Sequence, residues 1–326
     1  MKMIRGTLAG VALLAGCADT NAPLPDPVEV LLAVNREGNT LSVLPVEDPE
    51  SGSQVPLGAG DAVAVVDLRS RQVMRTIPLT GSGATGAAIV DDSVAYVANP
   101  NLNTVSRINY LTGESADVPV GLHPQAIVFA RGRVFVLNGN LDETLEPVGE
   151  SWITVIDPVT NAHATGIDSI PLSGGGNARS GAVGADGLLY VVVAGSTQES
   201  EGRLSLVDPV ERVEIASFSG LGRAPGQVAA NGDARVYISS TTEGLLAFDT
   251  DSNKVARGEG EGFPIPTNSG VALDSDQRVY ALEAGPCAGP ASGTAHVLAP
   301  DLSDELRTLP LGRCPAAALT VRIPPE

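Results

Sequence analysis

A short strand-like pattern recurs along this chain, and no other feature of the sequence limits the fold as strongly. Each copy carries a small residue inside a predicted strand. The copies follow one another at intervals of about 40–55 residues, which is the scale of a repeat unit. The six copies occupy residues 85–88, 124–127, 180–183, 225–228, 269–272 and 315–318.

Three further strands complete each unit. Strands with an aromatic or aliphatic core follow the first five copies at residues 95–97, 134–136, 189–191, 236–238 and 279–281. Third strands lie at residues 65–67, 107–109, 155–157, 206–208, 247–249 and 297–299. Most of the third strands end in Asp or Asn, whose side chains can cap a turn. A fourth strand follows each of them. Four short strands per unit, with no convincing helical period, predict the blades of an all-β β-propeller.

The two ends of the chain are predicted to share one blade. Residues 31–34 form a second strand with no first strand before it, and the last unit consists only of residues 315–322. Pairing them removes an open strand edge, so we expect the C-terminal strand to complete the N-terminal blade. Residues 65–67 and 75–79 would then be its outer strands. This gives six four-stranded blades in a single domain over residues 28–326, or seven if residues 39–44 begin a degenerate extra blade rather than belonging to an insertion.

The first residues have the features of a targeting signal. Lys2 and Arg5 precede a short apolar run at residues 6–15, which is too short to span a bilayer as a helix. The run ends in Leu14-Ala15-Gly16-Cys17, which resembles the lipobox of bacterial lipoproteins. The resemblance implies cleavage before Cys17 and acylation of that cysteine. An ordinary secretory signal with an incidental cysteine is the alternative.

These features predict three parts: a lipoprotein signal peptide at residues 1–16, a proline-rich flexible tether at residues 17–27, and the propeller. The expected location is extracytoplasmic, with a lipid anchor in the bacterial cell envelope. In an oxidising compartment the remaining cysteines, Cys287 and Cys314, are expected to form a disulfide. The net charge of −18 argues against nucleic acid and anionic lipid headgroups as partners.

One unit resembles a known repeat family. Ala95-Tyr96-Val97-Ala98-Asn99, then Asn103-Thr104-Val105-Ser106, then Gly121-Leu122-His123-Pro124 are similar to the YVTN-type β-propeller repeat. The resemblance is close in this unit and loose elsewhere. For example, the Asn that ends the second strand recurs as Asn35 and Asn138 but is replaced by Glu283 in the last unit. The resemblance implies a propeller fold and an extracytoplasmic setting. It implies little about chemistry, because the family is functionally diverse.

A ligand site is expected where the innermost strands begin, around the mouth of the central channel. By analogy with other propellers, residues at this position face the channel. The candidates for ligand binding are His123, Arg179, Arg223, Asn268 and Arg313. A partly basic ring in so acidic a chain could receive an anionic ligand or a substrate carboxylate. Alternatively, these side chains satisfy loop carbonyls or pair with neighbouring acids.

Four long insertions are predicted on the same face, between second and third strands. They are residues 36–60, 139–151, 195–202 and 284–293, and loops of such length are more often functional or disordered than incidental. Cys287 lies in the last insertion and Cys314 begins the closing strand, so a disulfide would fasten that insertion to the closure. The insertions are rich in Asp and Glu. These carboxylates could hold calcium, although exposed acidic loops are usually only solvated.

No catalytic constellation is recognisable in the sequence. The three histidines form no metal-binding pattern, and no nucleophile motif is present. We therefore expect a non-catalytic lipoprotein that binds a protein or small ligand through its insertion-rich face, with no cofactor. The alternative is an extracytoplasmic metal-dependent lactonase or hydrolase. In that case a divalent cation would lie in the channel, with Asn99, Asn138 and Glu283 as its ligands.

Overall fold

The computed structural model describes residues 26–58, 60–230, 232 and 234–325. The predicted signal peptide, Cys17 and all but the last two residues of the predicted tether lie outside these residues. Apart from two short 3-10 turns, the named elements of the described chain are β-strands. Nothing in this part of the chain forms a helix with the length and apolar character that a membrane crossing needs.

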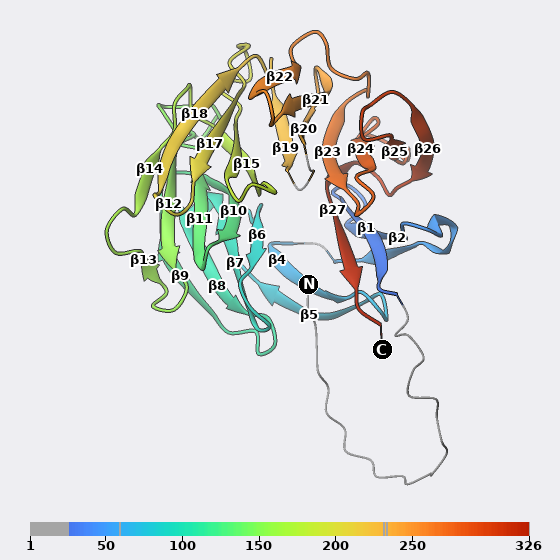
Figure 1. Ribbon diagram of the computed structural model, residues 1–326. Coiled ribbons are helices and arrows are strands. Elements are labelled where there is room, and N and C mark those ends of the chain that lie inside the picture. The colour runs from blue at the N-terminus through green and yellow to red at the C-terminus, as the bar shows by residue number, and fades with distance from the viewer. Residues whose placement is uncertain (1–25, 59, 231, 233, 326) are drawn as a thin grey trace, which may run out of the picture.

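The strands form a β-propeller (Figure 1), which confirms the prediction of six four-stranded blades. Each blade is an antiparallel sheet whose strands follow one another from the channel outward. Blade 1 is β27 (Pro315–Ile323), β1 (Val28–Asn35), β2 (Thr40–Pro45) and β3 (Ser53–Pro56). Blade 2 is β6 (Ala87–Ile89), β7 (Val94–Asn99), β8 (Thr104–Asn109) and β9 (Ser115–Pro119). Blade 3 is β10 (Pro124–Ala130), β11 (Arg133–Asn138) and β12 (Trp152–Asp157), with β13 (Ala162–His163) and β14 (Ser169–Pro171) sharing the outer position.

The remaining three blades are regular. Blade 4 is β15 (Ala178–Val183), β16 (Leu189–Val193), β17 (Arg203–Asp208) and β18 (Val213–Ser219). Blade 5 is β19 (Pro225–Ala229), β20 (Arg235–Ser240), β21 (Gly244–Asp249) and β22 (Lys254–Arg257). Blade 6 is β23 (Asn268–Leu273), β24 (Val279–Glu283), β25 (Thr294–Leu298) and β26 (Glu305–Pro310). The 3-10 turns η1 (Pro49–Ser51) and η2 (Pro100–Leu102) belong to blades 1 and 2.

The outer part of the N-terminal blade differs from the prediction. Its third and fourth strands are β2 and β3, so residues 36–60 are not a loop insertion. The predicted outer strands instead form a separate two-stranded sheet, β4 (Ala62–Asp67) and β5 (Gln72–Pro78). The reason is local: β1 turns back within a few residues and pairs with β2, the nearest strand along the chain. Residues 39–44 therefore supply the third strand of blade 1 and do not begin an extra blade.

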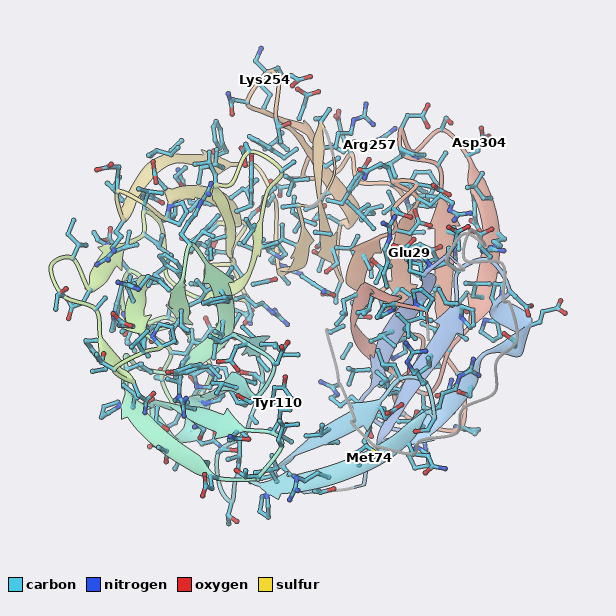
Figure 2. The ribbon with its side chains drawn as sticks, turned by 60° about the horizontal axis from the view of Figure 1, so that its bottom comes forward. Glu29, Met74, Tyr110, Lys254, Arg257 and Asp304 are labelled. Atoms are coloured by element: carbon cyan, nitrogen blue, oxygen red, sulfur yellow. A yellow bond between two sulfur atoms is a disulfide. The ribbon has the colours of Figure 1, made fainter. Side chains whose placement is uncertain are left out.

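The sheet β4–β5 occupies a place of its own in the ring, between blades 1 and 2. Val66 of β4 packs in the core of blade 1, whereas Val63 and Val65 pack against Val97 of blade 2. Figure 2 shows this side of the ring, with Met74 of β5 and Tyr110 of blade 2 labelled. The ring thus has seven positions, of which six hold four-stranded blades.

Apolar contacts between neighbouring blades form the core. The second strands contribute the largest side chains, and Tyr96, Phe135, Tyr190 and Tyr280 are fully buried. Glycine permits the closest approach of one blade to the next. A Cβ on Gly121, at the end of blade 2, would lie 2.3 Å from the Trp152 ring and 2.6 Å from Cγ of Asn138, both in blade 3. The glycine of this Gly-x-x-Pro turn therefore allows blade 2 to pack closely against blade 3.

The chain ends meet as predicted. Strand β27 pairs with β1 from Val28↔Ile323 to Asn35↔Pro315 and forms the inner strand of blade 1. The Cys287–Cys314 disulfide is present, with a Cα–Cα distance of 4.8 Å. It links the 284–293 loop of blade 6 to the residue before β27. The closure is therefore held both by a strand ladder and by a covalent bond.

Removal of the disulfide should weaken the closure. We expect Cys287→Ser to lower the free energy of unfolding by about 3 kcal/mol, because a cross-link of this span restricts the unfolded chain. Guanidinium denaturation measures the change, and reduction of the unmodified protein is the control that should reproduce it. A loss smaller than about 0.5 kcal/mol would contradict a stabilising role for the bond.

Candidate functional site

The inner strands begin on one face of the ring, and each is preceded by a residue in the left-handed backbone region. These residues are Gly83, His123, Asn177, Ala224, Thr267 and Cys314, with φ values from 44° to 65°. A register shift follows in five of the six inner strands, so that a residue bulges out of the ladder. Bulges redirect side chains, and here they recur at the rim of the channel. This rim is called the channel mouth below.

Several side chains at the start of the inner strands form hydrogen bonds with the start of the inner strand in the next blade. The Thr85 hydroxyl donates to the carbonyl of Gln125 at 2.8 Å, and Nε2 of Gln125 donates to Oδ1 of Asn177 at 2.7 Å. The Ser269 hydroxyl donates to the carbonyl of Pro315 at 2.6 Å. Arg179 holds the corresponding position in β15, yet its guanidinium makes no hydrogen bond or ion pair with any residue that the structure describes.

Arg179 has an unusual environment for a surface arginine. Its side chain reaches solvent, but enough protein surrounds it that burial lowers its pKa. Both properties fit a side chain that extends into a channel with protein on most sides. The group still carries its full charge at neutral pH, because the pKa of arginine starts above 12. The structure therefore holds a cation here without an acidic partner, within a strongly acidic chain.

Two further arginines lie near the same rim. Arg223 is exposed just before β19, and its side chain has no partner among the described residues. Arg313 precedes Cys314 and is half-buried, and its Nε is buried without a hydrogen-bond partner in the described structure. Arginines elsewhere are often paired, as in the 3.3 Å contact of Arg133 with Asp157 and the 2.6 Å contact of Arg278 with Asp274. The channel mouth is thus a place where guanidinium groups lack carboxylates.

His123 contributes no positive charge to the mouth at neutral pH. The residue is half-buried, and burial lowers its pKa from the usual 6.5 because the charged ring loses water. Its backbone is firmly held, since its N–H donates to Oδ1 of Asn103 at 2.8 Å. A neutral imidazole offers one donor and one acceptor to a ligand. The positive potential at the mouth therefore comes from the arginines.

Asn268 lies inside the protein rather than at the rim. It is fully buried, and its Nδ2 donates to the carbonyl of Gly244 at 3.1 Å. Its side-chain oxygen has no hydrogen-bond partner among the described residues. The structure thus groups Arg179, Arg223, Arg313 and His123 at the rim and sets Asn268 apart from them in the wall.

Gln227 is a channel residue that the sequence did not single out. Its Oε1 accepts hydrogen bonds from the N–H groups of Val271 (3.2 Å) and Ala318 (3.0 Å), and its Nε2 donates to the carbonyl of Ala318 (2.6 Å). One side chain of β19 therefore joins β23 and β27. A cavity of about 200 Å³ borders it, lined by small apolar residues of β15, β19, β23 and β27. In the sequence, the only indication of this role of Gln227 is that it is a polar residue within a strand of small residues.

The three residues proposed as metal ligands have partners within or next to their own blades. Asn99 donates to the hydroxyls of Thr104 (3.0 Å) and Ser106 (2.8 Å). Asn138 donates to the hydroxyl of Thr154 (2.9 Å) and accepts from the N–H of Gly121 (3.0 Å). Glu283 lies 2.9 Å from Nε2 of His296. In the described residues, no group of three His, Cys, Asp or Glu side chains is arranged to hold a metal ion.

Two of the insertions contact each other on this face. The Thr197 hydroxyl donates to Glu146, which links residues 195–202 to residues 139–151. The Ser200 hydroxyl donates to Glu259, which links the same loop to blade 5. Asp142 accepts bonds from the N–H groups of Thr144 and Glu146, so it organises its own loop. These two insertions are therefore bonded to each other and to blade 5, and acidic side chains accept the bonds.

The fold is similar to solved structures along nearly its whole length. A hydrazine synthase structure from Kuenenia stuttgartiensis is 15% identical, with a TM-score of 0.62 over 93% of this chain and 92% of that chain. A protein of unknown function from Bacteroides caccae is 12% identical, with a TM-score of 0.55 over 90% of this chain and 99% of that chain. No family model matches the sequence, and neither does any curated protein. At such low identity the similarity shows the fold alone.

The depressed pKa of His123 predicts a measurable pH dependence. Between the folded pKa and 6.5 the unfolded chain binds a proton that the folded chain does not, so stability falls as the pH drops through this window. In an NMR titration His123 should have its midpoint below 6.5. His163 is the internal comparison. Its hydrogen bonds to the Pro119 carbonyl and to Asp168 raise its pKa, so it should titrate above 6.5.

The variant His123→Asn separates this effect from other acid-sensitive groups. Asparagine tolerates the left-handed backbone of this position. The variant should lose less stability than the unmodified protein between neutral pH and about pH 5.5. Equal losses, or a His123 midpoint at or above 6.5, would contradict the assignment.

Proposed function

We propose that this chain is a binding protein that holds a small anionic ligand at the channel mouth, on the insertion-rich face of the propeller. The observation that carries the proposal is the state of Arg179. Its side chain reaches solvent at the start of β15, enough protein surrounds it that burial lowers its pKa, and no described carboxylate pairs with it. A charge held in this way is costly unless a ligand or water satisfies it.

Guanidinium groups select the chemical class of the ligand. Arginine donates two parallel hydrogen bonds to a carboxylate or a phosphate, which makes it the usual residue for such anions. Arg223 and Arg313 on the same rim would add charge, and neutral His123 would add one donor or acceptor. The carboxylates of the insertions would weaken the binding of any anion, so a ligand would have to match the mouth closely. A small carboxylate or phosphate ester fits these conditions.

A substitution at Arg179 tests the proposal. Isothermal titration at low ionic strength with citrate, succinate, glucuronate and inorganic phosphate should reveal binding of at least one of them. Arg179→Gln should weaken that binding by about tenfold or more, because it removes a charge-assisted hydrogen bond. Lys254→Gln is the matched control, since Lys254 lies at the outer rim of the ring (Figure 2) and its substitution removes the same charge.

Two results would refute the proposal. One is the absence of binding by all four anions. The other is an equal loss in Arg179→Gln and Lys254→Gln, which would mean that only net charge matters.

We further propose that the chain is a YVTN-type propeller lipoprotein that is tethered to the bacterial cell envelope through Cys17. The lipobox pattern at Leu14–Cys17 and the proline-rich residues after it support the anchor. The disulfide is compatible with an oxidising compartment. A tether would leave the propeller free to turn its channel mouth toward a ligand or a partner.

The anchor makes a simple prediction. Mass spectrometry of the mature protein from its native host should find an acylated Cys17 at the N-terminus. Cys17→Ser should move the protein from the membrane fraction to the soluble fraction, whereas the matched substitution Thr20→Ser should not. An unmodified cysteine, or unchanged membrane association of Cys17→Ser, would be incompatible with lipid anchoring.

A further inference from the structure

At the seventh position of the ring, the described residues supply two outer strands but no inner strand and no second strand. Six positions hold an inner strand and a second strand, but β4 and β5 correspond to a third and a fourth strand. The inner strands contact one another in sequence from β6 through β10, β15, β19 and β23 to β27. Strand β4 lies between the two ends of this series (Figure 1), and no described strand pairs with its channel-facing side.

The hydrogen-bond pattern shows which groups of β4 face inward. The N–H of Leu79 donates to the carbonyl of Asp61 at 2.8 Å, and Pro78 stands opposite Ala62. In an antiparallel pair, bonded and non-bonded positions alternate. Ala62 and Ala64 therefore direct their N–H and C=O groups away from β5, and none of these groups has a backbone partner among the described residues.

Exposed apolar side chains flank this edge on both sides. Val34 is 41% exposed and Leu319 is 51% exposed, both on the blade 1 face that packs against β4. Ile89 is 42% exposed on the facing side of blade 2. The residues that hold the place of Val34 in the other second strands are completely buried: Ala98, Leu137, Val192, Ser239 and Leu282. Val34 is thus exposed at a place where no described inner strand covers it.

The edge is also held in position. Val66 is buried against blade 1, and Val63 and Val65 pack against blade 2. A strand that is fixed on both faces presents its free N–H and C=O groups without a further ordering cost. An apolar, unpaired and rigid edge is what strand addition requires, because main-chain bonds give affinity and flanking pockets select side chains.

We propose that the open edge of β4 receives an apolar β-hairpin or strand from a partner protein, which completes the seventh blade. The other six positions each have two described strands inside the third strand, so a hairpin matches what β4 lacks among the described residues. Val34, Ile89 and Leu319 would contact its apolar side chains. The net charge of −18, with Asp61 and Asp67 at the two ends of β4, favours a segment with basic residues in its turn. This surface does not include Arg179 of blade 4, on which the anion proposal rests.

Other occupants fit less well. A second copy carries the same net charge of −18, which opposes its approach to this edge, and its strands already belong to the sheets of its own ring. The residues before β1 include Pro23, Pro25 and Pro27, and proline has no N–H to give to a strand edge. A partner hairpin meets neither restriction.

A synthetic peptide with the sequence of residues 125–138 is a suitable probe. In blade 3 this segment forms the first and second strands, with Arg131 in the turn and Arg133 at the start of the second strand. Fluorescence polarisation should detect its binding to the purified chain. Hydrogen exchange at the Ala62 and Ala64 amides should slow by about tenfold or more when it binds, because these groups become bonded. The same peptide with proline at the Phe135 and Leu137 positions should not bind.

A matched pair of variants tests the site. Leu319→Lys should weaken peptide binding by about tenfold or more, because it places a charge where apolar side chains must pack. Leu306→Lys, at a residue of β26 that is 52% exposed, should leave binding within about twofold. Arg179→Gln should bind the peptide normally, which separates this test from that of the anion site.

Three results would overturn the proposal. The peptide fails to bind, or it protects amides elsewhere than at Ala62 and Ala64. The third such result is slow exchange of the Ala62 and Ala64 amides in the chain without peptide. It would show that the chain's own N-terminal residues or a second copy already fills the edge.

Discussion

Apolar packing between neighbouring blades is the interaction on which the whole ring depends. Each core cluster takes its side chains from adjacent sheets rather than from within one sheet. Tyr190 of blade 4, for example, meets Phe248 of blade 5 edge-on, with ring centroids 6.3 Å apart. A single small sheet buries too little surface to be stable alone. The loops at the channel mouth therefore have fixed positions only because the blades below them lock together.

Most of the fold could be predicted from the sequence, because the pattern of apolar residues and the spacing of the repeated strands follow from which positions are buried. Strands with small or aromatic cores recur wherever a blade packs against the next. The prediction went wrong in the first blade, where two segments fit the third-strand pattern equally well. Thr40–Pro45 and Ala62–Asp67 are both apolar, and only pairing with β1 decides between them. A short hairpin connection favours the first, and the seventh position of the ring follows from that choice.

The positions of the candidate residues in the ring were predicted in part. Residues just before the repeated strands had to lie at the channel mouth, so Arg179, Arg223 and Arg313 could be named. The burial of Asn268 and the hydrogen bonds of Gln227 with two other inner strands could not be predicted. Gln227 binds Ala318, 91 residues later in the chain, and such contacts depend on how the ring closes. That no described residue pairs with Arg179 is likewise a property of the assembled ring, not of any local pattern.

The pairing of β27 with β1 has a consequence for the order in which the chain can fold. Strand β1 leaves the ribosome first, but its inner partner is made last. Until synthesis is nearly complete, the first blade has an unprotected edge next to two apolar faces, and the ring cannot shut. Contacts of such long range are slow to form and leave intermediates open to aggregation.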